Sequence, residues 1–208
     1  DVLGSRGLGD VYKRQGLAGI EDIYPSGTDR GKVVYVDFDG VYRNSEVWIN
    51  GHSLGFRPNG YVSFRYDLTP YLRYGSQPNV IVVKADNSEQ PNSRWYSGSG
   101  IYRNVWLVKV NPVHVDNWGT FVHDMKISPE EATFSLEARI RNSSEADREA
   151  EVSTSIYDDR NRVVTAPVTT LLRVPYTPCY DTRMREASVD HQFSISNPKL
   201  WSPDSPSL

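Results

Sequence analysis

The fold is decided by residues 32–56, which read KVVYVDFDGVYRNSEVWINGHSLGF. This stretch opens with Val33–Phe38, a β-branched and aromatic run of the kind that forms strands. Ser45–Ile49 alternates polar and apolar residues, as a half-buried strand does. The Asn50-Gly51 pair that follows is the strongest short-range hairpin signal in the chain, and His52–Phe56 is its return strand. These residues therefore predict antiparallel β structure.

The same pattern continues towards residue 110. After the turn at residues 58–60, a strand is expected at Tyr61–Tyr66, with Tyr61 and Ser63 on one face and Val62, Phe64 and Tyr66 on the other. A single helical turn is expected within Asp67–Leu72. The run Asn79–Ala85 is nearly all apolar, which predicts a strand buried on both faces. Val105–Val110 is the strand that closes this unit.

A second domain is expected after Asn111-Pro112, because proline cannot donate to a central strand ladder. Beyond it, segments of alternating character recur about every ten residues and predict an immunoglobulin-like sandwich. The expected strands are residues 113–122, 132–141, 150–157, 163–172 and 187–195. The fold class is thus all-β: a jelly-roll, galactose-binding-like sandwich followed by an immunoglobulin-like one.

The domain limits that follow are residues 1–15, 16–111 and 113–208. Residues 1–15, DVLGSRGLGDVYKRQ, match no strand or helix pattern and are expected to be a non-native or disordered leader. A flexible N-terminal arm is the alternative. The first sandwich is expected to be incomplete at its N-terminus, without the strands that would precede Thr28. The second is expected to lack its last strand.

Composition excludes several kinds of partner and cofactor. The net charge of −3 gives no basic excess with which to grip a phosphate backbone, so no nucleic acid is expected. No apolar run approaches the roughly 20 residues that span a membrane. One cysteine, Cys179, and four scattered histidines give no spacing typical of a metal site. No metal and no cofactor are predicted.

The residues offer no catalytic centre. Glycoside hydrolysis needs two carboxyl groups flanking the scissile bond, whereas Asp39, Asp86 and Asp158 all stand in predicted turns. Ser97–Gly100 superficially resembles a nucleophile elbow but leads into a strand rather than a helix. The loop 86–100 that contains it is long, and long loops without structure of their own are usually functional or disordered.

Three phrases in order give the chain a family resemblance: Phe38-Asp39-Gly40-Val41, the VWINGH run at residues 47–52, and RWYSGSGIYRNVWL at residues 94–107. Together with NPKLWSPDSP at residues 197–206, they resemble the N-terminal part of glycoside hydrolase family 2, the β-galactosidase and β-glucuronidase group. In that family a sugar-binding sandwich and an immunoglobulin-like sandwich precede a TIM barrel that holds both catalytic glutamates. The resemblance therefore implies the non-catalytic part of a β-glycosidase.

The resemblance also implies substrate-binding positions. Asn50 is similar to an asparagine that helps line the substrate site, although it could simply be the left-handed residue of its turn. Asn92, Ser93 and Arg94 stand where many members carry a sugar-binding aspartate. The resemblance therefore does not decide whether the substrate is a galactoside, a glucuronide or another sugar. Trp95 either stacks on a sugar ring or pins the loop to its own core.

Three functional hypotheses follow. The favoured one is the non-catalytic part of a family 2 β-glycosidase, inactive alone, with a β-glycoside as the substrate of the parent enzyme. A free-standing carbohydrate-binding module is the alternative, and a structural or adhesive pair of sandwiches is the third. The resemblance further implies a possible homo-oligomeric parent and a periplasmic or extracellular location.

Overall fold

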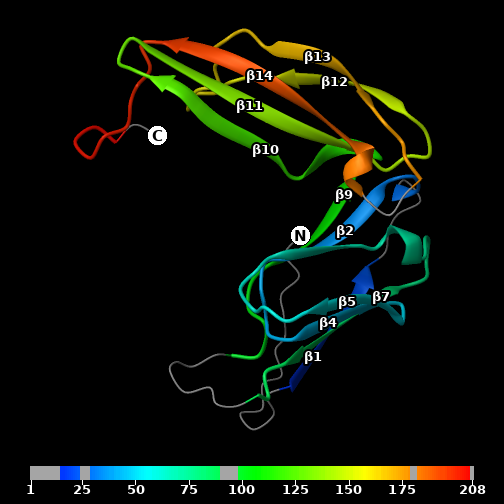
Figure 1. The fold of residues 1–208 in the computed structure, drawn as a ribbon. Coiled ribbons are helices and arrows are strands. Elements are labelled where there is room, and N and C mark those ends of the chain that lie inside the picture. Colours follow the sequence, from blue (N-terminus) through cyan, green and yellow to red (C-terminus); the bar gives the residue numbers. More distant parts are fainter. Residues whose placement is uncertain (1–14, 24–28, 90–97, 179–181, 207–208) are drawn as a thin grey trace. The chain divides into compact units, whose positions relative to one another are not determined.

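The computed structural model describes residues 15–23, 29–89, 98–178 and 182–206. Across these residues the ordered structure is made of strands, with short 3₁₀ turns at Thr69–Tyr71 and Thr182–Arg185. Figure 1 shows two groups of strands, and they correspond to two compact units, Asp1–Asn111 and Pro112–Leu208. In the described part of the chain, no helix is long and apolar enough to cross a membrane. The all-β prediction is confirmed.

The first unit contains two main sheets. One has the strand order β1-β7-β4-β5 and the other has the order β6-β2-β9. A short pair, β3 with β8, joins Val41–Tyr42 to Gly100–Ile101. The main strands are β1 (Gln15–Ile23), β2 (Val33–Phe38), β4 (Ser45–Ile49), β5 (His52–Arg57), β6 (Phe64–Asp67), β7 (Asn79–Asp86) and β9 (Val105–Val110).

The core of this unit forms where the two sheets face each other. Val36 and Phe38 of β2 belong to the same buried cluster as Ile49 of β4 and Ile81 of β7. Successive strand residues point to opposite faces, so these alternate positions place one row of side chains inside. Each fully buried side chain of this size contributes about 1.5–3 kcal/mol. The alternation read from the sequence is thus what holds the two sheets together.

Strand positions in this unit follow the sequence closely, with three differences. A strand that was not predicted, β1, begins at Gln15 and pairs with β7 from Asp86 to Asn79. It lies where strands were expected to be missing. Burial along β7 alternates between full and partial, so the expectation of burial on both faces is wrong. Strand β6 begins only at Phe64, so Val62 lies before the strand and is more than half exposed, whereas Phe64 and Tyr66 are buried.

The second unit is built from a three-stranded sheet and a two-stranded sheet. The larger sheet has the order β10-β11-β14, and β12 pairs with β13. Their bounds are Val113–Ile127 for β10, Glu131–Asn142 for β11, Arg148–Thr154 for β12, Val168–Val174 for β13 and Glu186–Ser196 for β14. Strand β10 extends five residues beyond its predicted end at Val122. The expected strand at 163–172 begins later, at Val168.

A buried histidine links the two sheets of this unit. His191 of β14 is 2% exposed. Its Nδ1 lies 2.9 Å from the Thr154 hydroxyl of β12, and its Nε2 lies 3.0 Å from the Thr170 hydroxyl of β13. A buried polar group is stable only when its hydrogen-bonding atoms are satisfied, and both ring nitrogens have a partner here. His191 therefore acts as a polar cross-link between the sheets.

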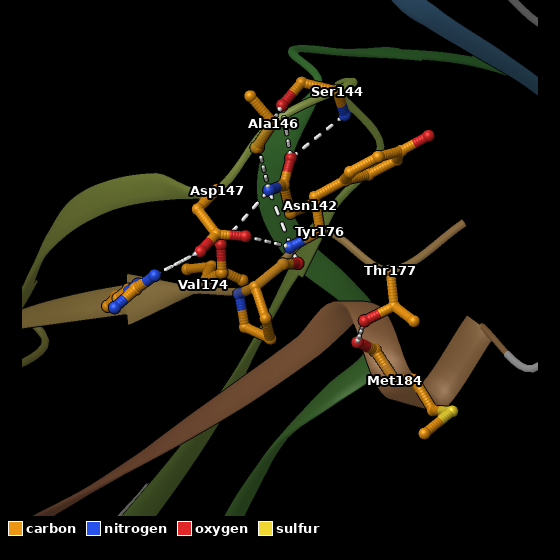
Figure 2. Close-up of polar contacts among 10 residues, drawn as sticks. Asn142, Ser144, Ala146, Asp147, Val174, Tyr176, Thr177 and Met184 are labelled. Carbon is orange, nitrogen blue, oxygen red and sulfur yellow. Dashed lines mark hydrogen bonds and ion pairs between the residues drawn. The ribbon is translucent and has the colours of Figure 1, made fainter. Parts of the chain in front are cut away.

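The turn between β11 and β12 is held by the buried Asn142 (Figure 2). Its amide nitrogen donates to the carbonyl oxygens of Ala146 at 2.8 Å and Val174 at 3.1 Å. Its side-chain oxygen accepts from the Ser144 backbone N–H at 2.9 Å. Beside it, Asp147 accepts a 2.7 Å bond from the Tyr176 backbone N–H. One asparagine thus joins a turn to the end of a strand about thirty residues later.

Candidate sugar-contacting edge of the first unit

The Asn50-Gly51 turn is the first site predicted from sequence. Asn50 and Gly51 have φ values of 50° and 86°, and Ile49 pairs with His52, as a two-residue type I′ hairpin requires. The Asn50 amide nitrogen donates to the Tyr71 carbonyl oxygen at 2.8 Å and to the Asn79 side-chain oxygen at 2.9 Å. Both amide hydrogens are therefore engaged inside the unit.

The Asn50 side-chain oxygen is engaged as well. It accepts a 3.0 Å bond from the Val80 backbone N–H, while the Asn50 backbone N–H donates to the Val80 carbonyl oxygen at 2.9 Å. An amide oxygen has two lone pairs, so one acceptor position is left for another donor. Asn50 is therefore a turn residue whose side chain links the end of β4 to β7 by hydrogen bonds. Its part in sugar binding stays a prediction.

The loop 86–100 is anchored at its start by residues of the segment 43–44. The Asp86 backbone N–H donates to the Arg43 carbonyl oxygen at 2.9 Å, and the Asn44 amide nitrogen donates to the Asp86 carbonyl oxygen at 3.1 Å. The Arg43 guanidinium also lies 2.9 Å from a carboxylate oxygen of Glu89. These contacts fix the direction in which the loop leaves β7.

The end of the same loop is anchored by the neighbouring residues 40–42. Val41 pairs with Ile101, and Tyr42 pairs with Gly100. One short segment, residues 40–44, therefore contacts both ends of the loop and brings them close together. The predicted site residues Asn92, Ser93, Arg94 and Trp95 belong to the middle of this loop and lie outside the described residues.

Two tyrosine rings seated on glycines shape the surface beside the loop. The Tyr102 ring fills the space that a side chain on Gly40 would need, because a Cβ there would lie 2.6 Å from the ring. The Tyr42 ring does the same at Gly60, where the distance would be 2.3 Å. Tyr42 also meets Tyr61 edge to face, with ring centroids 5.3 Å apart. Only glycine permits such close approach of ring to backbone.

A hydrogen bond ties the residue 58–63 corner to the end of the loop. The Tyr102 hydroxyl donates to the Gly60 carbonyl oxygen at 2.8 Å. The Asn44 backbone N–H donates to the Pro58 carbonyl oxygen at 3.3 Å. Tyr61 is 60% exposed and Tyr102 is 50% exposed, so each presents much of its ring to solvent. Two exposed aromatic rings, those of Tyr61 and Tyr102, thus lie beside the base of the loop.

An open pocket of about 330 Å³ lies at this corner, lined by residues 57–59 and 62–65. Its polar groups include Arg57, Asn59 and Ser63, and its apolar surface includes Val62 and Phe64. No sequence pattern described above points to this pocket. The signal that could have identified it is the Pro58-Asn59-Gly60 turn between two strands, where polar and aromatic residues mix.

Two carboxylates of the same sheet, Asp37 and Asp39, already have partners. Asp37 accepts two bonds of 2.6 Å from Arg65, a bidentate pair. Asp39 accepts a 3.0 Å bond from the Trp106 indole N–H. Such pairing holds side chains in place and does not resemble an acid and a nucleophile that flank a glycosidic bond. Among the described residues, no group of acidic, histidine or cysteine side chains could hold a metal ion.

Taken together, the groups at this edge are of the kinds that contact sugar rings in proteins. Sugar rings present C–H faces that pack on aromatic side chains and hydroxyl groups that hydrogen-bond to amides, hydroxyls and guanidinium groups. Tyr61 supplies an exposed ring, and Arg57, Asn59 and Ser63 supply the polar groups. The first unit is thus a β-sandwich whose edge presents an exposed aromatic ring beside hydrogen-bonding side chains.

Comparison with known families agrees with this class. Residues 23–111 match the profile described as "Glycosyl hydrolases family 2, sugar binding domain". Residues 114–208 match the profile described as "Glycosyl hydrolases family 2". The chain belongs to glycosyl hydrolase family 2. The two matched domains are non-catalytic domains of the family.

Individual relatives point the same way. The chain is 44% identical to a β-galactosidase of Bacteroides ovatus over 86% of its own length and 20% of that protein. It is 32% identical to a β-glucuronidase of Formosa agariphila over 83% of its length and 19% of that protein. A family 2 crystal structure from Bacteroides cellulosilyticus superposes with a TM-score of 0.84 and 31% identity, covering 94% of this chain and 25% of the other. The chain spans about a fifth of the length of the curated relatives it matches.

Proposed function

We propose that this chain is the substrate-shaping, non-catalytic part of a longer β-glycosidase that hydrolyses terminal β-linked sugars. In this proposal the catalytic carboxylates belong to another part of that polypeptide, and the first unit supplies contacts to the bound sugar. Retaining hydrolysis through a covalent glycosyl-enzyme intermediate is the mechanism that the family resemblance implies. The chain alone would then bind or position a sugar without cleaving it.

The observation that supports the proposal is the hydrogen bond from the Tyr102 hydroxyl to the Gly60 carbonyl oxygen. It joins the loop 86–100, which contains the predicted sugar-binding positions, to the pocket at residues 57–65. Two surface elements that are distant in sequence are thereby held as one edge. Preorganised contacts of this kind bind a ligand more strongly than mobile ones, because less conformational freedom is lost on binding.

The test compares Tyr61→Ala with Tyr157→Ala in the longer enzyme. Tyr61 is 60% exposed at the proposed edge, and Tyr157 is 56% exposed in the second unit, so the two changes remove similar surface. Loss of one stacking partner worth about 0.5–1.5 kcal/mol corresponds to a change of roughly twofold to tenfold in KM. Tyr61→Ala is expected to raise KM by that factor for the preferred substrate, and Tyr157→Ala to leave it unchanged.

Nitrophenyl β-galactoside and nitrophenyl β-glucuronide should both be assayed, since relatives carry either activity in their names. The 208-residue chain is expected to hydrolyse neither. Turnover by this chain alone would overturn the assignment of catalysis to another part of the protein. Equal KM values for the two variants would overturn the role of the Tyr61 edge. If the chain binds sugars but is not part of a longer enzyme, the free-standing binding module would be favoured.

A further inference from the structure

The pocket at residues 57–65 carries a positive charge that its own residues do not neutralise. Two of its lining residues are arginines, Arg57 and Arg65, and none of those that the structure describes is acidic. Arg65 is matched by Asp37, which accepts two bonds of 2.6 Å from its guanidinium. Arg57 forms no ion pair with any side chain in the described part of the chain. The excess charge of the pocket is therefore that of Arg57.

The position of this charge is set by a buried tyrosine. Arg57 is the last residue of the edge strand β5, and its guanidinium carbon lies 5.6 Å from the centroid of the Tyr66 ring. Burial raises the pKa of the Tyr66 phenol, and the nearby charge of Arg57 opposes that rise. A guanidinium has five N–H donors, more than contact with one tyrosine can use. Arg57 is thus oriented by Tyr66 and keeps donors for a ligand.

The neutral side chains of the pocket add a further donor. The Asn59 side-chain oxygen accepts a 2.8 Å bond from the Tyr61 backbone N–H, which leaves the two amide hydrogens of Asn59 as donors. The Ser63 hydroxyl donates to the Asp39 carbonyl oxygen at 3.3 Å. Arg57 and Asn59 therefore present hydrogen-bond donors beside a positive charge. The matching ligand group is negatively charged and made of acceptor oxygens.

We infer that this pocket binds the anionic group of an acidic saccharide, with Arg57 as its charge partner and Asn59 as a second donor. Carboxylates and sulfate esters share this chemistry, since both present several acceptor oxygens and a negative charge. Tyr61 lies in sequence between the two stretches that line the pocket and is 60% exposed, so its ring can pack on the same sugar. A neutral sugar would leave Arg57 without a counter-charge.

This inference rests on the proposed function in one respect, namely that the residue 57–65 corner contacts the sugar. It adds the chemical class of that sugar. The test follows the arginine side-chain Nε–H signals of the ¹⁵N-labelled 208-residue chain by NMR. The Arg57 signal is assigned by its loss in Arg57→Gln. Spectra are recorded at about pH 6, where carboxylates and sulfate esters are ionised and arginine is protonated.

Three saccharide probes that differ only at carbon 6 are titrated at equal ionic strength. They are methyl β-glucuronide with a carboxylate, methyl β-glucoside 6-sulfate with a sulfate ester, and methyl β-glucoside with a neutral hydroxymethyl group. At least one acidic probe should shift the Arg57 signal in a saturable way. Its Kd should be at least about tenfold lower than that of the neutral probe, the ratio that one charge-assisted hydrogen bond produces. The tighter acidic probe identifies the anionic group.

Arg57→Gln should raise the Kd for the tighter acidic probe at least about tenfold and leave the Kd for the neutral probe unchanged, measured from the backbone signals of residues 57–65. Arg30→Gln is the matched control, because Arg30 is also exposed and lies 4.9 Å from the centroid of a tyrosine ring, that of Tyr74. It should change neither Kd. Raising the salt concentration from about 0.05 to 0.5 M should weaken binding of the acidic probe alone.

Several outcomes would overturn the inference. One is an Arg57 signal that no acidic probe shifts. Another is equal affinity for the acidic and neutral probes. A third is acetate or inorganic sulfate that binds as tightly as the acidic saccharides, which would show a site for small anions without recognition of the sugar. Equal losses of affinity in Arg57→Gln and Arg30→Gln would show a general effect of positive charge instead.

Failure of this inference can be told apart from failure of the proposed function. If the neutral probe shifts the backbone signals of residues 57–65 and the acidic probes bind no better, the acidic class is wrong and the sugar-contacting edge stands. If the acidic probe binds through Arg57 but the longer protein cleaves no β-glycoside, the proposed function is wrong and the binding site stands.

Discussion

The Tyr102 hydroxyl donates a 2.8 Å hydrogen bond to the carbonyl oxygen of Gly60, which lies 42 residues earlier in the chain. This bond connects the end of the loop 86–100 to the corner that carries the pocket. The Tyr102 ring simultaneously occupies the space above Gly40. One side chain thus holds together three segments of the proposed sugar-contacting edge.

Replacing Tyr102 with Phe removes this hydrogen bond and keeps the ring. We expect Tyr102→Phe to lower the free energy of unfolding of the first unit by about 0.5–1.5 kcal/mol, the net worth of one such bond. Urea denaturation measures it. Hydrogen exchange should at the same time become faster in residues 98–104. Unchanged exchange there would show that the bond does not fix the loop.

Adding a methyl group at Gly40 tests the close approach of the Tyr102 ring. A Cβ at Gly40 would lie 2.6 Å from that ring, so Gly40→Ala should cost about 1–3 kcal/mol through overpacking. Gly98→Ala is the matched control, since no atom comes within 4 Å of a Cβ there. Urea denaturation of both variants makes the comparison. Equal stability of the two variants would contradict the packing described.

The amide network of Asn50 can be separated from its backbone conformation. Asn50→Gly keeps the left-handed turn but leaves the buried Asn79 and the Val80 N–H short of a partner, and should cost about 1–3 kcal/mol. Asn50→Ala should cost about 1 kcal/mol more, because alanine resists a φ of 50°. Thermal or urea unfolding measures both. A neutral Asn50→Gly would mean that the side chain is free to serve a ligand instead.

The stability of the second unit should depend on the ionisation of Asp147. A hydrogen bond from the Tyr176 backbone N–H, followed by that from Arg173, lowers the pKa of this carboxyl from its ordinary value of 3.8. A group whose folded pKa is depressed stabilises the fold above its unfolded pKa, and this contribution is lost as the pH falls through the folded value. Unfolding midpoints should therefore decline below about pH 4.

Asp147→Asn is the control for this pH dependence. The variant cannot titrate at position 147, so its midpoint should fall less steeply over the same acid range. Because Asp147 is solvent-exposed, the effect should also shrink at high salt concentration. Parallel curves for the two proteins would show that Asp147 does not contribute to acid sensitivity.

The sequence predicted those strands whose pattern is local. Val33–Phe38 and Ser45–Ile49 have the predicted bounds, because β-branched runs, alternation and an Asn-Gly turn are all visible over a few residues. Strand β1 carried no such signal, since two glycines interrupt it and it forms by pairing with β7. Strand β6 starts at Phe64 rather than Tyr61 for a similar reason, because its first residue is set by pairing with Phe38 of the neighbouring strand β2.

For the candidate site, the sequence pointed to the loop 86–100 and to Asn50, and it missed the pocket at residues 57–65. Asn92, Ser93, Arg94 and Trp95 fall outside the described residues, so their roles remain predictions. The pocket could not be read from spacing alone. Its lining residues all lie within the stretch 57–65, but whether a turn between two strands encloses a pocket depends on how its side chains pack, and that leaves no periodic signal.

The sequence by itself determined the all-β class, the division near residue 111 and the family resemblance, because strand periodicity, turn chemistry and short phrases are properties of neighbouring residues. Only the tertiary structure decided that both amide hydrogens of Asn50 are hydrogen-bonded within the first unit. It also decided that the rings of Tyr42 and Tyr102 pack against glycines beside a pocket, and that Trp118 is exposed with a left-handed backbone conformation on a bulge. The physical reason is that hydrogen bonding and burial are settled by which distant segments meet, and a linear pattern does not specify those meetings.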